Sequence, residues 1–321
     1  MEEKIDLKDR KILYELDKDS SQTNKQIARR VGASEMVVSN KIKRLIDKGV
    51  IENFYVKTNS SLLGSIHLKV YLRLHNITKI KERELLNHLK KQKNILWLAS
   101  LRGKYDIVLS VYVKSISEFS EKYEVLFSGW HEYILDRNVV VLESASTYTK
   151  AYLLEKQMPE EIVYSEGEKI NKVDKKDEEL LKLLSTKSRM RFVDIANKLK
   201  VSADTVKYRI RNLEKKGIIT GFGVKINFDK LSNNYHLIFL KLQNMDLKKY
   251  SQLKNLSKIN KNVIVYIKTI GDHEAELEIE TSNKEELDNL IKDLRDKFVN
   301  EIKDYELLEV TEEHLLNYYP F

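Results

Sequence analysis

The sequence predicts an α+β protein in which one unit is used twice, and three observations support this fold class. Residues 6–59 align with residues 174–227 without a gap, at a shift of 168 positions, and 19 positions are identical. In both copies the sequence predicts three short helices followed by a β-rich run. About a hundred residues with alternating apolar strands follow each copy. Most identical positions are apolar or turn residues, so the repeat preserves a fold.

Two helices are predicted at the start of each copy. In the first copy, Asp6 is suited to cap a helix that runs to about Lys18. Thr23 and Gln26 then have the spacing of a capping box, which satisfies backbone N–H groups at the start of a second helix. The second copy begins in the same way at Asp174.

A third helix in each copy is predicted over residues 34–49 and 202–217, from a capping serine to a lysine–glycine stop. Its apolar face recurs at i, i+4 and i+7, as Val38, Ile42 and Leu45, and as Val206, Ile210 and Leu213. The opposite face carries Met36, Ser39, Asn40 and Lys43 in the first copy, and Asp204, Lys207, Tyr208 and Arg211 in the second. A short helix with a polar, basic front is suited to the major groove of DNA, although ordinary surface helices share this pattern.

The β-rich run at 50–57 is expected to form a two-stranded wing, which completes a winged helix-turn-helix. Charge supports this interpretation. Residues 5–59 hold twelve basic and eight acidic side chains, and residues 173–227 hold fourteen and seven. These segments therefore carry a net charge of +11, whereas the whole chain carries +8. Positive charge confined to these two segments predicts double-stranded DNA as the partner.

The order strand, helix, strand, strand, helix, strand is predicted after each copy. The first set comprises strands at 66–74, 95–101, 107–113 and 137–146, with helices at 82–91 and 117–127. The second set comprises strands at 235–243, 263–269, 275–280 and 305–310, with helices at 246–257 and 283–298. This order is typical of a ferredoxin-like domain, in which two helices cover one face of an antiparallel sheet.

The predicted domain organisation follows from these elements. Winged helix-turn-helix domains are expected at 1–60 and 173–228, ferredoxin-like domains at 61–158 and 229–321, and a polar linker at 159–172.

Composition excludes several classes of protein. The absence of cysteine excludes disulfides and thiolate metal sites. No apolar run approaches the roughly 18 residues of a membrane span, and the charged N-terminus is unlike a signal peptide, so we expect a cytoplasmic protein. The seven histidines lack metal-ligand spacing, and no catalytic constellation is evident. We therefore expect neither an enzyme nor a bound cofactor or metal.

The chain resembles the Lrp/AsnC family of transcription regulators, twice over. The resemblance rests on residues 6–13, the helix at 34–49 and the Gly-x-x-Asp turn at 103–106, and again on 174–181, 202–219 and the turn at 271–274. It implies dimerisation through the ferredoxin-like domains and recognition of an amino acid or other small-molecule effector near the turns. The chain departs from the family in carrying two units and in having Glu274 where the turn ends in aspartate.

Two sets of candidate site residues follow. The predicted DNA-binding residues are Met36, Ser39, Asn40, Lys41, Lys43, Arg44, Asp204, Lys207, Tyr208, Arg209 and Arg211. The predicted effector residues are Gly103, Asp106, Gly271 and Glu274, because glycine allows close backbone approach and a carboxylate accepts an amino group. A tight hairpin bend explains the same glycines without a ligand.

Other interpretations stay open. Siroheme decarboxylases share this two-domain fold, but 103–109 and 271–277 lack their His-x-Tyr-Asn-x-Trp-Phe motif. An interaction scaffold without DNA binding is a third alternative. The ferredoxin-like domains can pair within one chain, as a built-in pseudo-dimer, or between chains of a homo-oligomer. Pairing within the chain is favoured, because a linker of about fourteen residues can span ~20 Å.

Overall fold

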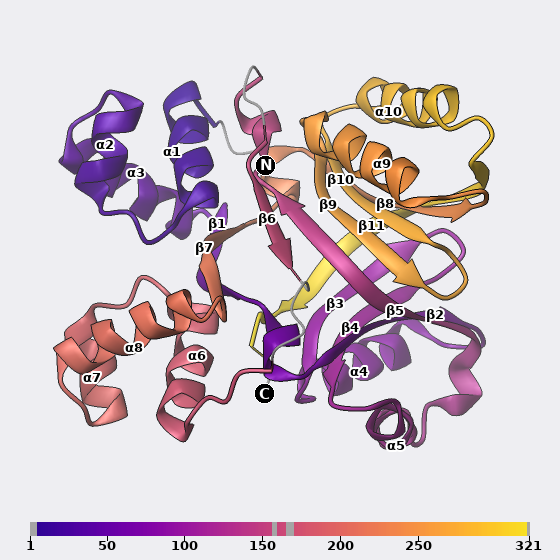
Figure 1. The fold of residues 1–321 in the computed structure, drawn as a ribbon, viewed down its shortest axis with the longest axis horizontal. Helices are drawn as coiled ribbons and strands as arrows, with labels where there is room; N and C mark the ends of the chain where they lie inside the picture. The colour runs from indigo at the N-terminus through magenta and orange to yellow at the C-terminus, as the bar shows by residue number, and fades with distance from the viewer. Residues whose placement is uncertain (1–4, 156–158, 165–169, 320–321) are drawn as a thin grey trace.

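The computed structural model describes residues 5–155, 159–164 and 170–319. Two helical domains lie side by side at one end of the molecule, on the left of Figure 1, and the large sheet lies at the other. The first domain contains helices α1 (Leu7–Lys18), α2 (Asn24–Val31) and α3 (Glu35–Asp47). The second contains α6 (Lys175–Lys187), α7 (Phe192–Leu199) and α8 (Ala203–Lys215).

The predicted helix caps are confirmed. Asp6 and Asp9 form a reciprocal capping box at the start of α1, and Thr23 and Gln26 form another at the start of α2. Ser202 accepts a hydrogen bond of 3.0 Å from the N–H of Thr205 at the start of α8, and Ser34 caps α3 in the same way. These bonds satisfy backbone donors that a helix start otherwise leaves unpaired.

The prediction that each helical domain has a two-stranded wing of its own is wrong. Each domain contributes a single strand, β1 (Ile51–Thr58) or β7 (Ile219–Ile226), and these two strands pair antiparallel with each other. Val56 of β1 packs in the core of the second helical domain, and Ile226 of β7 packs in the core of the first. The wing is therefore shared, and each helical domain depends on a strand from the other half.

The remaining elements form two ferredoxin-like units, as predicted. The first comprises β2 (Ile66–Leu74), α4 (Lys79–Lys90), β3 (Ile95–Arg102), β4 (Ile107–Val113), α5 (Ile116–Leu126) and β5 (Ile134–Tyr148). The second comprises β8 (Asn234–Leu242), α9 (Leu247–Ile259), β9 (Val263–Ile270), β10 (Ala275–Thr281), α10 (Lys284–Lys297) and β11 (Ile302–Leu316). Each strand of the second unit begins 168 positions after its counterpart in the first, so the repeat extends through both ferredoxin-like units.

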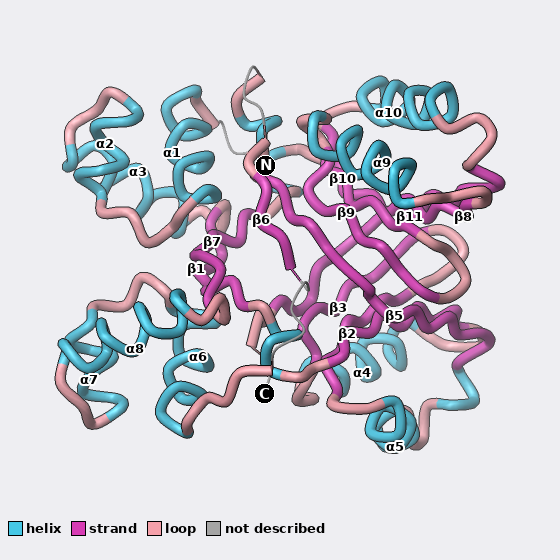
Figure 2. Tube along the Cα trace, in the orientation of Figure 1, coloured by secondary structure: helices cyan, strands magenta, loops and turns pink. Residues whose placement is uncertain are grey.

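The two units close into one sheet within the chain. The strand β5 pairs first with β2 of its own unit and then with β9 of the other. The strand β11 likewise pairs with β8 and then with β3. Both strands are 15 residues long, longer than predicted, because each serves two partners. The pairings form a closed ring in the order β2-β4-β3-β11-β8-β10-β9-β5, with helices outside it (Figure 2).

Alternation along the strands decides which side chains face the helices and which face the inside of the ring. Leu68, Val70 and Leu72 of β2 pack in the core beneath α4 and α5, as Leu277 and Ile279 of β10 do beneath α9 and α10. The alternate residues, such as Lys69 and Tyr71, point into the ring.

The predicted linker is not entirely coil. Within it, β6 (Glu161–Tyr164) pairs with the end of β5 and extends the sheet. Residues 165–169 of the predicted linker, and Pro320 and Phe321 of the C-terminal tail, lie outside the described residues.

Candidate nucleic-acid interface

The helices α3 and α8 present the predicted polar fronts to solvent. Met36, Ser39, Asn40 and Lys43 are exposed on α3, and Asp204, Lys207, Tyr208 and Arg211 are exposed on α8. Met36 and Tyr208 are 69% and 68% exposed, which is unusual for large apolar or aromatic side chains and leaves them available to a partner. The apolar residues of both helices are buried, as the spacing predicts.

Three of the predicted DNA-binding side chains, Lys41, Arg44 and Arg209, form ion pairs within their own domain and are not part of this exposed face. The Nζ of Lys41 lies 2.7 Å from Asp6 and 2.9 Å from the buried Asp9, and Arg44 lies 2.5 Å from Asp9. Arg209, the counterpart of Lys41, lies 2.8 Å from Asp174 and 2.7 Å from Asp177. These bonds fix α3 on α1 and α8 on α6.

The same ion pairs perturb the acidic caps. The hydrogen bond from Lys41 lowers the pKa of Asp6 to about 2, and the hydrogen bond from Arg209 lowers the pKa of Asp174. Both carboxylates therefore stay ionised, and each cation is already neutralised locally. DNA contact by Lys41, Arg44 and Arg209 stays a prediction.

The two turns predicted to bind an effector have equivalent structures. The carboxylate of Asp106 accepts a hydrogen bond of 2.7 Å from the N–H of Leu74. Glu274 accepts one of 2.7 Å from Leu242, so the longer side chain reproduces the same bond. One role of these acidic residues is therefore to fix the turn to the neighbouring strand.

The glycines of these turns allow close contact between the two halves. A Cβ on Gly103 would lie 2.6 Å from the side chain of Leu308 on β11. A Cβ on Gly271 would lie 2.7 Å from Val140 on β5, which is the counterpart of Leu308. Gly103 and Gly271 thus sit where each turn packs on the last strand of the opposite half. Effector binding at the four turn residues stays a prediction.

Sequence reasoning did not identify the polar side chains inside the ring. Lys69 on β2 lies 2.7 Å from both Glu276 and Glu278 on β10, and the Tyr71 hydroxyl donates to Glu276 at 2.5 Å. The alternation Glu276, Glu278, Glu280 along a predicted strand was the available signal, since it places three carboxylates on one face. Nothing local to β10 indicated a lysine as their partner.

Among the described helices, none is long and apolar enough to cross a membrane. In the same described part of the chain, no group of three or more His, Asp or Glu side chains is arranged to hold a metal ion.

Comparisons with known proteins agree with this architecture. A model described as "winged helix-turn-helix DNA-binding" matches residues 5–52 and 173–220, again 168 positions apart. The chain is 34% identical over 117 residues to the HTH-type transcriptional regulator Ptr1 of Methanocaldococcus jannaschii, covering 36% of this chain and 78% of that protein. An HTH-type transcriptional regulator of Pyrococcus furiosus is 30% identical over 121 residues, 37% of this chain and 80% of that one.

The solved structure of the siroheme decarboxylase NirDL resembles the whole chain in fold. It has a TM-score of 0.62 at 14% identity and covers 98% of this chain and 94% of that one. At that identity the likeness concerns the fold alone. The fold and the sequence relatives define a winged-helix transcriptional regulator with ferredoxin-like domains. The chain belongs to the Lrp/AsnC family, with the family's unit present twice in tandem.

Proposed function

We propose that the protein is a sequence-specific DNA-binding transcription regulator that reads two unlike half-sites with α3 and α8. The observation that carries the proposal is the exposure of two recognition faces with different side chains. Ser39 and Lys43 on α3 correspond to Lys207 and Arg211 on α8, and these pairs cannot make the same contacts to base edges.

Arg211 provides the direct test. Arg211→Ala is expected to weaken DNA binding by about 1–3 kcal/mol if Arg211 reads a guanine edge, with relaxed specificity at one base pair. If Arg211 contacts only phosphate, affinity falls evenly across sequences and the salt slope falls by about one. Fluorescence anisotropy at several salt concentrations distinguishes these outcomes.

The matched control is Arg295→Ala, which removes an exposed arginine from α10 on the far side of the sheet. An Arg211→Ala variant that binds DNA like Arg295→Ala in both affinity and salt dependence would place Arg211 outside the interface. The absence of an electrophoretic shift by the wild-type protein at low salt would instead support an interaction scaffold.

We further propose that the protein responds to a small molecule, with the turns at 103–106 and 271–274 as candidate sites for an amino acid. Thermal-shift screening of the amino acids against wild type and Asp106→Asn tests this proposal. The asparagine keeps an acceptor for the N–H of Leu74 but removes the charge that would hold an ammonium group. Equal shifts in both proteins, or none, would leave Asp106 with its structural role.

We also propose that the protein is not an enzyme, although its fold resembles that of NirDL along the whole chain. Glu278, Glu280 and Glu313 border the inside of the ring. Glu278 and Glu280 are paired with lysines, so the carboxylate of Glu313 in particular would repel a porphyrin that itself carries several carboxylates. Haem-like absorbance that survives gel filtration after siroheme is added would contradict this part of the proposal.

A further inference from the structure

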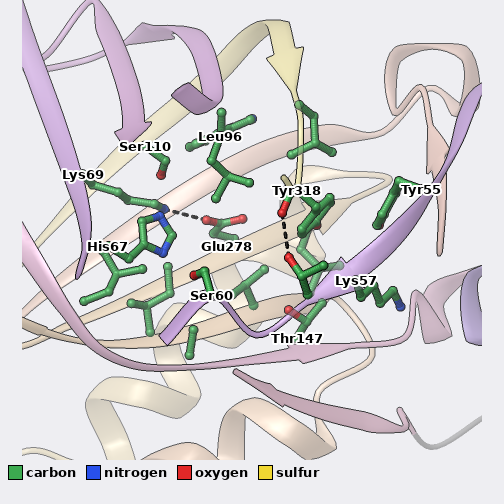
Figure 3. A pocket seen from close by; sticks show the side chains of 18 of the residues that line it. Tyr55, Lys57, Ser60, His67, Lys69, Leu96, Ser110, Thr147, Glu278 and Tyr318 are labelled. Carbon is green, nitrogen blue, oxygen red and sulfur yellow. Dashed lines mark hydrogen bonds and ion pairs between the residues drawn. The ribbon is translucent and has the colours of Figure 1, made fainter. Parts of the chain in front are cut away.

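A cavity of about 370 Å³ lies inside the ring, at the end that meets the shared wing. Its wall includes Tyr55 and Lys57 of β1, Val224 and Lys225 of β7, and inward-facing residues of both ferredoxin-like units. Figure 3 shows Lys69 of the first half joined to Glu278 of the second, with His67 beside Lys69. This volume is within the usual range for sites of small ligands.

Most charges around the cavity are already matched. Lys69 pairs with Glu278, whose other oxygen accepts a hydrogen bond of 2.5 Å from the Tyr235 hydroxyl. Lys150 and the Tyr152 hydroxyl both bind the carboxylate of Glu280. The remaining matched pairs of the cavity wall are Lys225 with Glu52 and Glu143 with Lys268, each at 2.7 Å.

Three charged residues of the described cavity wall lie outside these ion pairs: Asp17, Lys57 and Glu313. The Nζ of Lys57 donates to the carbonyl oxygen of Asp17 at 3.3 Å, so these two residues lie together. Figure 3 shows the Lys57 side chain at the edge of the cavity, away from the contact between Lys69 and Glu278. Among the described residues, Glu313 is thus a carboxylate of the wall that forms no ion pair, although the charges of Lys225 and Lys150, each paired elsewhere, also act on it.

Glu313 has one defined partner. The indole N–H of Trp97 donates to its Oε1 at 2.8 Å, and within the described residues Glu313 forms no ion pair. Burial raises the pKa of Glu313, because the surroundings do not fully replace the hydration of the charged form. A carboxylate held in this way is stabilised by a cation that enters the cavity.

The other walls suit the body of an organic amine. Trp97, Tyr112, Tyr235 and the stacked pair Tyr55 and Tyr318 supply aromatic faces, which attract cations as well as apolar groups. A carboxylate ligand would find fewer partners. Lys69 and Lys150 are already paired with carboxylates, and the Nζ of Lys57 donates to the carbonyl oxygen of Asp17 at the edge of the cavity. Burial lowers the pKa of His67 to about 3, which keeps the imidazole neutral.

We propose that this cavity binds a small primary amine with an apolar body, whose ammonium group is held by Glu313. The occupied cavity also contacts the wing that joins the two DNA-binding domains. Tyr318 accepts a hydrogen bond of 2.7 Å from Thr58 through its backbone oxygen and stacks on Tyr55 at 4.3 Å, both residues being on or at the end of β1. An amine that moves Tyr318 therefore shifts the wing. This regulatory consequence rests on the proposed function, whereas the binding itself does not.

Binding is measured with the full chain and without DNA. The probes are 2-phenylethylamine and hexylamine, with 3-phenylpropanoate and heptanoate as carboxylates of matching shape. The signal is Trp97 fluorescence in a Trp130→Phe background, because Trp97 donates directly to Glu313 and Trp130 lies on the outside near α4. At least one amine should change the emission saturably, and its matched carboxylate should bind at least tenfold more weakly.

Two variants locate the site. Glu313→Gln keeps an acceptor for Trp97 and should weaken amine binding tenfold or more, whereas Glu312→Gln, an exposed neighbour on β11, should not. Ser110→Leu adds bulk to the cavity wall from β4, leaves the Glu313 carboxylate in place and should also weaken binding. Circular-dichroism melting shows whether each variant folds. If Glu313→Gln does not fold, Ser110→Leu provides the test of the site.

The proposal is overturned if neither amine saturates the wild-type signal, if the carboxylates bind as tightly, or if Glu313→Gln and Ser110→Leu both bind like Glu312→Gln. Loss of amine binding in these variants with DNA affinity retained supports it. Amine binding by a protein that does not bind DNA would contradict the proposed function and leave this inference standing.

Discussion

At the scale of residues, the buried charges inside the ring are complementary between the halves and not within them. Lys69 on β2 corresponds to Leu237 on β8, and Glu276 and Glu278 on β10 correspond to Val108 and Ser110 on β4. Pairing of two first halves would leave two buried lysines without acids. Pairing of two second halves would bury carboxylates without cations. Both arrangements are costly, so this network favours pairing of unlike halves.

Replacement of Lys69 tests the network. Lys69→Met removes the cation from two carboxylates and is expected to lower the free energy of unfolding by about 3–5 kcal/mol. The surface control Lys81→Met, which breaks an exposed pair with Glu84, should leave the free energy of unfolding nearly unchanged. Urea denaturation measures both. Adding Glu278→Gln to Lys69→Met should recover part of the loss, and equal losses in the two single variants would refute the network's role.

Acid stability should depend on the same lysine. Burial alone raises the pKa of Glu276, but the charge of Lys69 holds it below its ordinary value of 4.5. The stability that Glu276 contributes is therefore present above pH 4.5 and is lost as the pH falls through the lower folded value. In Lys69→Met the loss should begin at a higher pH. Unfolding followed by circular dichroism across an acid titration would detect this shift.

Arg209 and Lys207 separate folding from DNA recognition on one helix. Arg209→Ala removes the ion pairs to Asp174 and Asp177 and should lower the free energy of unfolding by about 1–3 kcal/mol. Lys207→Ala should leave the free energy of unfolding within about 0.5 kcal/mol, because Lys207 is exposed, and should weaken DNA binding. The opposite pattern in melting and anisotropy would place Arg209 on the reading face.

At the scale of elements, the turn between β9 and β10 requires glycine. Gly271 has a φ of +154°, and an added Cβ would approach the Val139 carbonyl and the Val140 Cα at 3.2 Å. Gly271→Ala should therefore destabilise the protein by about 1–3 kcal/mol through crowding, beyond the backbone strain of alanine at positive φ. Thermal melting measures the difference.

Gly129→Ala is the matched control for backbone strain. Gly129 has a φ of +80°, and an added Cβ would meet no atom within 4 Å. Its loss of stability should reflect strain alone and be smaller than that of Gly271→Ala. Equal losses would mean that contact between the halves does not determine the glycine at this turn.

At the scale of the whole molecule, two recognition helices with different faces belong to one chain whose halves pair with each other. A dimer of identical units reads a palindrome, whereas this pseudo-dimer should read two unlike half-sites centred about 34 Å apart, or a multiple of that distance. Light scattering and DNA footprinting test this together. A monomer that protects two unlike half-sites is the expected result, and a dimer on a perfect palindrome would contradict it.

The sequence by itself determined the local structure of this protein. The caps at Asp6, Thr23 and Ser34 involve partners three residues away, so their signals lie within one turn of helix. Alternation along β2 identified a strand with two different faces, and the shift of 168 positions identified the tandem units. The exposed fronts of α3 and α8 followed from helical spacing alone.

The tertiary structure decided which distant strands pair and which charges meet. That β1 pairs with β7, and that β5 and β11 each cross to the opposite half, depends on contacts between residues far apart in the chain. The same holds for Lys69 and Glu276, which lie 207 positions apart in the chain. Arg209 was predicted to contact DNA because of its position on α8, but the structure shows it in an ion pair with Asp177 of α6. The spacing of residues along the chain does not reveal such distant partners. Packing and the pairing of buried charges determine which residues meet.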